Sequence, residues 1–157
     1  MKKVIVMFAL SFIFLFVFTT AIAGASEDHD KGAKHFTNKS IKGMWGFSGS
    51  ATVYPPLAPE PTPGSNLGTT YFDGKGNCVV KGWVSIGDIV LGPITSDKCT
   101  YSVNPDGTGS GTAYYSDPFA PESSRIEFVI VDHGRELRAI YSDPDYPICG
   151  GFTAKRQ

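Results

Sequence analysis

Glycine and proline interrupt this chain so often after residue 40 that helices of ordinary length have little room to form. The sequence holds 18 glycines and 11 prolines, and every proline lies beyond residue 50. No window beyond residue 25 has apolar side chains at helical spacing, whereas β-branched and aromatic residues are frequent. The pattern therefore predicts an all-β fold. Its eight expected strands span residues 43–54, 67–72, 77–86, 97–103, 108–116, 125–132, 135–142 and 149–156.

The connections between these strands fall into two classes that alternate along the chain. Three are short and contain glycine, as tight turns require: 73–76, 104–107 and 133–134. The others are longer and mostly rich in proline: 55–66, 87–96, 117–124 and 143–148. Alternate connections of an up-and-down sheet lie at opposite ends. We therefore predict a single eight-stranded antiparallel up-and-down barrel, closed at one end and ringed by loops at the other.

The side chains of the expected strands alternate as in a sheet with one apolar face. Trp45, Phe47 and Val53 share a face of the first strand, and small polar residues or glycine stand between them. Such strands can close into a barrel or split into a sandwich, and the meander order favours the barrel. The tight turns predict a register that pairs Ile130 with Leu137, Phe128 with Ala139, Ile126 with Tyr141, Tyr101 with Gly111 and Cys99 with Ala113.

The first 23 residues have the parts of a secretory signal peptide. Two lysines precede an apolar run, Val4 to Phe18, in which Ser11 is the one polar residue, and small residues follow it. Because a membrane-spanning helix needs about 20 apolar residues, we expect cleavage after Ala23 or Ala25 and no membrane span in the mature form. The protein is thus expected to be secreted or periplasmic. Residues 24–40 are polar and aperiodic, which indicates a flexible tail before a barrel domain at 41–157.

The charge of the mature chain excludes some classes of partner. Without Lys2 and Lys3, 12 basic residues face 15 acidic ones, a net charge of −3 with no basic run. A nucleic-acid partner is therefore not expected. The common catalytic signatures are absent from the sequence, and we predict no cofactor and no metal site. The oligomeric state is left open.

Three cysteines in an exported chain predict one disulfide and one remaining thiol. Cys78 and Cys99 belong to consecutive expected strands and to the inward face. A chain reversal near Gly87-Asp88 would bring Cys78 within one residue pair of Cys99. We therefore predict a Cys78–Cys99 disulfide, with Cys149 free or engaged between molecules.

Gly43-Met44-Trp45 opens the first expected strand, and Arg156 closes the last. This arrangement resembles the calycin group of barrels, which includes lipocalins, avidin-like proteins and fatty-acid-binding proteins. In that group a Gly-x-Trp packs against an arginine from near the end of the chain. The resemblance implies that Trp45 and Arg156 close the floor of the barrel, with the guanidinium stacked on the indole. The allene oxide cyclase-like barrels have the same general shape and are an alternative relative.

The sequence Tyr-Ser-Asp-Pro occurs twice, from Tyr115 and from Tyr141, where two expected strands reach the mouth. Alternation turns both tyrosines inward and places Asp117 and Asp143 at the opening. Asp-Pro after a strand is also ordinary turn chemistry, so a purely structural interpretation stays open. The residues predicted to bind a ligand are Tyr115, Tyr141, Tyr101, Phe47 and Phe128.

The expected inward face carries almost no charge, and this property favours an apolar ligand. It comprises Phe47, Val53, Phe72, Val84, Tyr101, Phe128, Leu137 and Phe152. We predict a secreted barrel that binds a small, largely apolar ligand at its mouth. One alternative is a structural or interaction module with a solid core, since eight-stranded barrels can be filled by side chains. Another is a cyclase or isomerase in which Asp117 or Asp143 acts as general acid or base. A cavity would separate the solid core from the other two.

Overall fold

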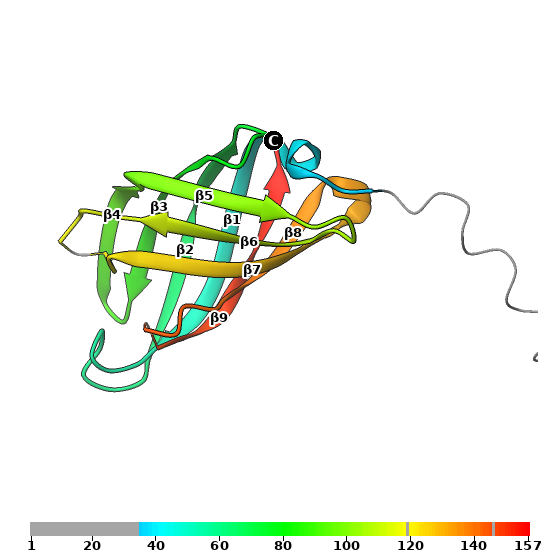
Figure 1. Cartoon of the computed structure of the whole chain (residues 1–157). Helices are drawn as coiled ribbons and strands as arrows, with labels where there is room; N and C mark the ends of the chain where they lie inside the picture. The colour runs from blue at the N-terminus through cyan, green and yellow to red at the C-terminus, as the bar shows by residue number, and fades with distance from the viewer. Residues whose placement is uncertain (1–34, 119, 146) are drawn as a thin grey trace, which may run out of the picture. The chain divides into compact units, whose positions relative to one another are not determined.

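The structure, a computed structural model, describes residues 35–118, 120–145 and 147–157, which form an all-β domain (Figure 1). Nine antiparallel strands make one curled sheet in the order β4-β3-β2-β1-β9-β8-β7-β6-β5. The expected signal peptide and residues 24–34 of the expected tail lie outside the described residues. The strands are β1 Gly43–Val53, β2 Thr62–Phe72, β3 Cys78–Ile86, β4 Ile89–Thr95, β5 Lys98–Val103, β6 Thr108–Tyr114, β7 Ser123–Val131, β8 Glu136–Tyr141 and β9 Ile148–Arg156.

The expected number of eight strands is wrong, because β4 lies within the connection 87–96 that was expected to be a loop. β4 pairs with β3 from Ile86↔Ile89 to Lys81↔Thr95. The Gly92-Pro93 pair favoured a loop in the sequence, since proline lacks the N–H that a strand inside a sheet must donate. Here β4 is an edge strand and its register shifts opposite Trp83, so the missing donor is tolerated.

β4 and β5 form one nearly continuous segment that changes partner half-way along. The N–H of Ser96 donates to the Val80 carbonyl at 2.9 Å, and the N–H of Asp97 donates to the Tyr114 carbonyl at 2.9 Å. The segment therefore leaves β3 and joins β6 between these two residues. A single bridge, Asn77↔Thr100, then holds β5 beside the start of β3. In the described part of the chain, the edges of the sheet meet beside the start of β3, and the fold is a curled half-barrel rather than the fully closed barrel that was expected.

The turns that follow β2, β5 and β7 lie at the end where the edges meet, which we call the floor (Figure 1). The longer loops lie at the opposite end, the mouth, but so does the two-residue turn Gly87-Asp88 that joins β3 to β4. The expected registers of β7 with β8 and of β5 with β6 are confirmed. The turn between β7 and β8 is longer than the expected two residues, because the 3-10 turn η2 occupies Asp132–Gly134 with positive φ at all three positions. Since Val131 still pairs with Glu136, the inward face is unchanged.

Trp45 forms the floor of the domain and is fully buried. Its Nε1–H donates to the Ile41 carbonyl at 2.8 Å. The guanidinium carbon of Arg156 lies 5.0 Å from the centre of the indole, and Arg156 Nη2 donates to the Ser40 carbonyl. The structure thus places Trp45 against Arg156, the contact that the calycin resemblance implied.

Residues just before β1, which were assigned to the flexible tail, belong to this floor. They include the 3-10 turn η1, Asn38–Ile41, whose last residue is fully buried. The N–H of Phe36 donates to the Pro105 carbonyl at 3.1 Å, and Asn38 Oδ1 accepts from the N–H of Val103 at 2.8 Å. The ordered domain therefore begins before residue 41.

The Cys78–Cys99 disulfide is confirmed, with the two Cα atoms 4.8 Å apart. It joins the first residue of β3 to the second residue of β5 and so closes the seam between the sheet edges at the floor. Both residues are buried, whereas Cys149 is free and exposed.

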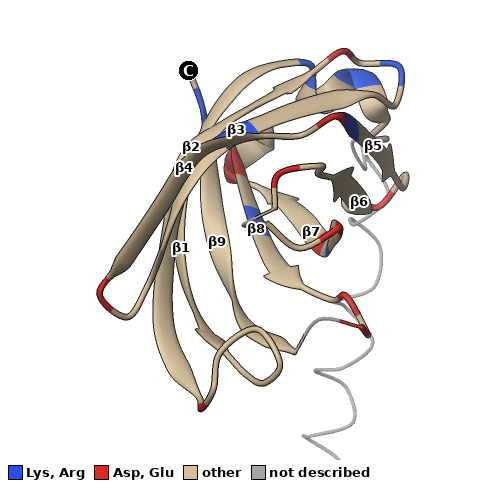
Figure 2. Ribbon diagram, turned by 90° about the vertical axis from the view of Figure 1, so that its left-hand side faces the viewer, with Lys and Arg blue, Asp and Glu red and all other residues tan. Residues whose placement is uncertain are grey.

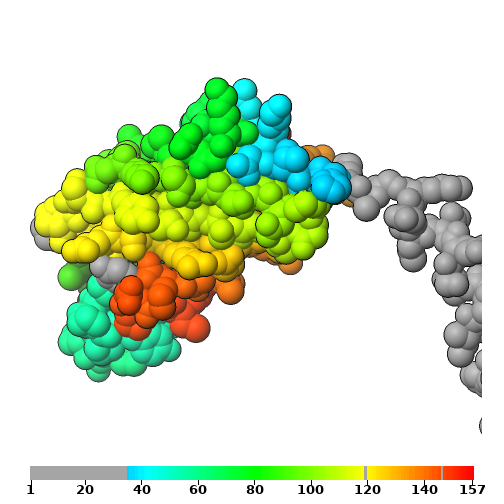
Figure 3. Space-filling view, viewed as in Figure 1, coloured from blue at the N-terminus to red at the C-terminus, as the bar shows by residue number. Residues whose placement is uncertain are grey.

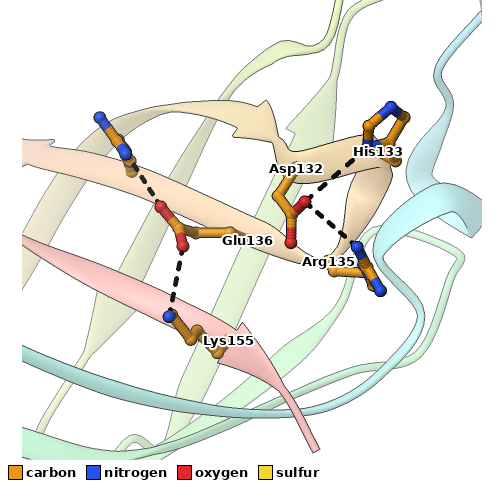
Figure 4. A network of polar contacts seen from close by, with 6 residues as sticks. Asp132, His133, Arg135, Glu136 and Lys155 are labelled. Carbon is orange, nitrogen blue, oxygen red and sulfur yellow. Dashed lines mark hydrogen bonds and ion pairs between the residues drawn. The ribbon is translucent and has the colours of Figure 1, made fainter.

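Figure 2 shows most of the Asp, Glu, Lys and Arg residues of the described chain at turns and near the ends of strands. Glu136 accepts from Arg138 at 3.0 Å and lies 3.6 Å from Lys155, while Asp132 pairs with Arg135 at 3.3 Å (Figure 4). Exposed pairs of this kind contribute little to stability. The position of these charged residues matters more for the interior, because the concave face of the sheet is left to uncharged residues.

Candidate functional site

The curled sheet encloses a cavity of about 540 Å³. This volume is within the range of small-molecule binding sites, roughly 300–1,000 Å³, and far above the space for one buried water. No Asp, Glu, Lys, Arg or His is among the described residues that line the cavity. All eight side chains expected on the inward face do line it: Phe47, Val53, Phe72, Val84, Tyr101, Phe128, Leu137 and Phe152.

Two large aromatic rings of the cavity wall lie over glycines of the neighbouring strands, which keeps these rings close to the wall. Gly68 and Gly82 face each other on β2 and β3, and a Cβ on Gly68 would lie 2.8 Å from Cζ of Phe47. The ring of Phe128 covers Gly109 in the same way, 2.6 Å from a Cβ placed there. Glycine is required at both places, since any side chain would push the ring into the cavity.

Aromatic contacts divide the wall into a floor group and a mouth group. Near the floor, Phe72 contacts Tyr101 edge-on, with ring centroids 4.8 Å apart. The Tyr101 hydroxyl accepts from the N–H of Gly74 at 2.8 Å and donates to the Asn38 carbonyl at 3.2 Å. Tyr101 therefore presents only its ring to the cavity, and burial raises the pKa of its phenol.

In the mouth group, the ring of Phe152 lies 5.4 Å from Phe47 and 5.9 Å from Tyr141. Tyr141 and Tyr115 both line the cavity, as the repeated Tyr-Ser-Asp-Pro motif predicted. The pKa of each phenol is raised to about 12, by burial for Tyr115 and by burial together with the nearby Tyr115 for Tyr141. Both phenols are therefore uncharged at neutral pH.

A polar residue that the sequence analysis missed stands opposite Tyr141. Asn66 of β2 lines the cavity, and its Nδ2 donates to the Tyr141 hydroxyl. Its Oδ1 is buried and has no hydrogen-bond partner in the described structure. Asn66 was assigned to the loop 55–66, but β2 begins at Thr62. The alternation of Asn66, Gly68 and Thr70 with the exposed Leu67 and Tyr71 was the signal that could have found it.

The two rim aspartates do not line the cavity. Asp143 binds its own loop and β7: its Oδ1 accepts from the N–H of Asp145 and its Oδ2 from Ser123 Oγ, both at 3.0 Å. The backbone carbonyl of Asp117 accepts from the N–H of Ala120 at 3.0 Å, which makes a turn there. Neither aspartate therefore belongs to the described lining of the cavity, and both Asp-Pro pairs take part in turns.

Loops and the unexpected strand complete the mouth. The loop 54–61 and the loop 142–147 lie side by side, and the N–H of Tyr54 donates to the Pro147 carbonyl at 3.0 Å (Figure 3). Apolar residues of these and neighbouring segments line the cavity: Pro56, Leu57, Pro118, Ile89, Leu91 and Ile94. Trp83 is 40% exposed and also borders the cavity, at the point where the register of β3 and β4 shifts.

Comparisons with known protein families, with curated proteins and with solved structures found no match to this chain. Within the described part of the chain, no helix has the length and apolar character needed to cross a membrane. Nor do three His, Cys, Asp or Glu side chains gather there in a group that could hold a metal ion. Function must therefore be argued from the cavity and the groups that line it.

Proposed function

We propose that this protein is an exported binding protein that takes a small, largely apolar ligand into the cavity from the mouth. The observation that carries the proposal is an uncharged cavity of about 540 Å³ inside a small domain. Protein interiors are ordinarily packed to the density of organic crystals, because every void forfeits dispersion contacts. A cavity of this size disfavours the alternative of a solid-core interaction module, since a ligand would supply the missing contacts.

Export is supported by two independent features. The first 23 residues have the pattern of a signal peptide, and the Cys78–Cys99 disulfide is typical of oxidising compartments. We propose a secreted or periplasmic location on this basis. We also propose a calycin-like relationship, supported by the contact between Trp45 and Arg156 at the floor. No observation favours a cyclase or isomerase, because neither Asp117 nor Asp143 lines the cavity.

The proposal is tested by titration of the purified protein with N-phenyl-1-naphthylamine, a neutral apolar dye whose emission rises in apolar surroundings. We expect saturable binding of one dye per chain. A Cβ on Gly111 would make only ordinary contacts, the nearest at 3.5 Å, and Gly111 lines the cavity. Gly111→Leu should therefore fill the cavity and weaken dye binding at least about tenfold, as a bulky obstruction costs more than 1.4 kcal/mol.

The matched control is Ser110→Leu, which adds the same side chain to the next position of β6, whose side chain leaves the sheet on the opposite face. This variant should bind the dye as the wild type does. Equal weakening by both variants, or no saturable binding by the wild type, would refute the proposal.

A further inference from the structure

We infer that the cavity selects an uncharged ligand with a hydroxyl group, and that Asn66 and Tyr141 bind this hydroxyl. The inference rests on the proposed function and adds the chemical class of the ligand. It starts from a polar contact that crosses the cavity, between Asn66 and Tyr141. Asn66 belongs to β2 and Tyr141 to β8, which are separated in the sheet by β1 and β9. Their side chains nevertheless meet, because the sheet curls and brings its opposite walls together.

Asn66 Oδ1 is a buried acceptor without a donor in the described structure. A buried polar atom without a partner destabilises a protein, and native structures leave few such atoms. This atom belongs to a side chain that lines an uncharged cavity large enough for a ligand. A ligand with a hydrogen-bond donor would satisfy it, whereas a purely apolar ligand would bury it more deeply without a partner.

The Tyr141 hydroxyl supplies the complementary group. It accepts a hydrogen bond from Asn66 Nδ2, which leaves its own O–H to donate. Burial keeps this phenol protonated at neutral pH. It does the same for Tyr115, the second phenol of the cavity wall. The cavity wall therefore holds an acceptor without a partner, Asn66 Oδ1, in the same pair of side chains as a donor, the Tyr141 O–H.

A hydroxyl group matches this pair, because it donates one hydrogen bond and accepts others. An ether accepts but cannot donate, so it leaves Asn66 Oδ1 unsatisfied. An ionised carboxylate has the same defect and also brings a charge into a cavity that has no charged side chain among its described lining residues. The expected order of affinity for chains of equal length is therefore alcohol first, with ether and carboxylate weaker.

The test is displacement of bound N-phenyl-1-naphthylamine from the purified protein by 1-decanol, decyl methyl ether and decanoate at pH 8. We expect 1-decanol to compete about tenfold more strongly than either of the others. This factor corresponds to the free-energy difference between a buried acceptor that has a hydrogen bond and one that lacks it. Asn66→Leu, which keeps the approximate size of the side chain, should abolish the preference of alcohol over ether and still bind the dye.

The matched control is Ser142→Ala. Ser142 Oγ is the other buried side-chain oxygen without a partner among the described residues, but Ser142 does not line the cavity. This variant should keep the preference for the alcohol. If Asn66→Leu fails to fold, Tyr141→Phe removes only the hydroxyl and should weaken competition by 1-decanol and by the ether alike, at least about threefold, as loss of a single neutral hydrogen bond does; unchanged competition by both would overturn the inference.

The outcomes separate the inference from the proposed function. Dye binding with equal competition by alcohol and ether, or a preference that survives in Asn66→Leu, overturns the inference and leaves the proposed function standing. Absence of dye binding by the wild type overturns both. A preference for the alcohol that is lost in Asn66→Leu and kept in Ser142→Ala supports the inference.

Discussion

Removal of the Cys78–Cys99 disulfide should destabilise the domain by about 3 kcal/mol. The two cysteines are 21 residues apart in the chain, and the chain-entropy relation for a loop of that length gives roughly this free energy at 25 °C. Both residues are buried, so alanine is a suitable replacement that leaves no polar group behind. The seam between β3 and β5 would then depend on the Asn77↔Thr100 bridge and on backbone bonds such as that from the Tyr101 N–H to the Gly76 carbonyl, 2.9 Å.

The measurement is urea unfolding of the double variant Cys78→Ala/Cys99→Ala, followed by circular dichroism. Cys149→Ala is the control, because this thiol is free and exposed and its removal should change the unfolding free energy by less than about 0.5 kcal/mol. Dye affinity should fall in the double variant, since both cysteines line the cavity. A loss of stability below about 1 kcal/mol would refute the reasoning, because the disulfide would then not restrict the unfolded chain as the loop relation requires.

Two further predictions concern the floor and the mouth. Arg156→Ala should lower the unfolding free energy by about 1 to 2 kcal/mol through lost stacking on Trp45, measured by thermal unfolding; an unchanged midpoint would show that the stack contributes nothing. Tyr115 and Tyr141 should ionise near pH 12, above the ordinary value of 10, in a titration of absorbance at 295 nm. Because the folded pKa is raised, the stability linked to these phenols is fully present below pH 10 and is lost as the pH rises toward 12. In Tyr115→Phe/Tyr141→Phe the alkaline loss between pH 10 and 12 should be smaller, and an equal loss would contradict the assignment.

Several features of this protein follow from local sequence patterns. Glycine in the short connections and alternation along the strands were enough to predict which residues pair between β7 and β8 and which side chains face inward. Turn chemistry of this kind acts within a few residues: one carboxylate oxygen of Asp73 accepts the N–H groups of Lys75, Gly76 and Asn77 and so sets the turn before β3. The disulfide followed from the same reasoning, because register and side-chain direction together place Cys78 near Cys99.

Other features depend on groups that are distant in the chain. β4 carries a proline, and only its place at the edge of the curled sheet makes that residue acceptable. Asp143 was expected over the opening, but hydrogen bonds within its loop and to Ser123 hold it away from the cavity. Neither outcome can be derived from alternation, because the period of two determines the direction of a side chain only within a strand.

The cavity and its polar pair were decided by the tertiary structure alone. Sequence alternation showed that the inward residues are large and apolar, yet it could not distinguish a hollow interior from a filled one. That depends on where each ring lies relative to a glycine on the neighbouring strand, as Phe47 does over Gly68 and Gly82. The contact between Asn66 and Tyr141 depends likewise on the curl of the sheet, which joins residues from strands that are not neighbours. Local patterns determine which face a residue occupies, and the closure of the sheet determines what it meets across the interior.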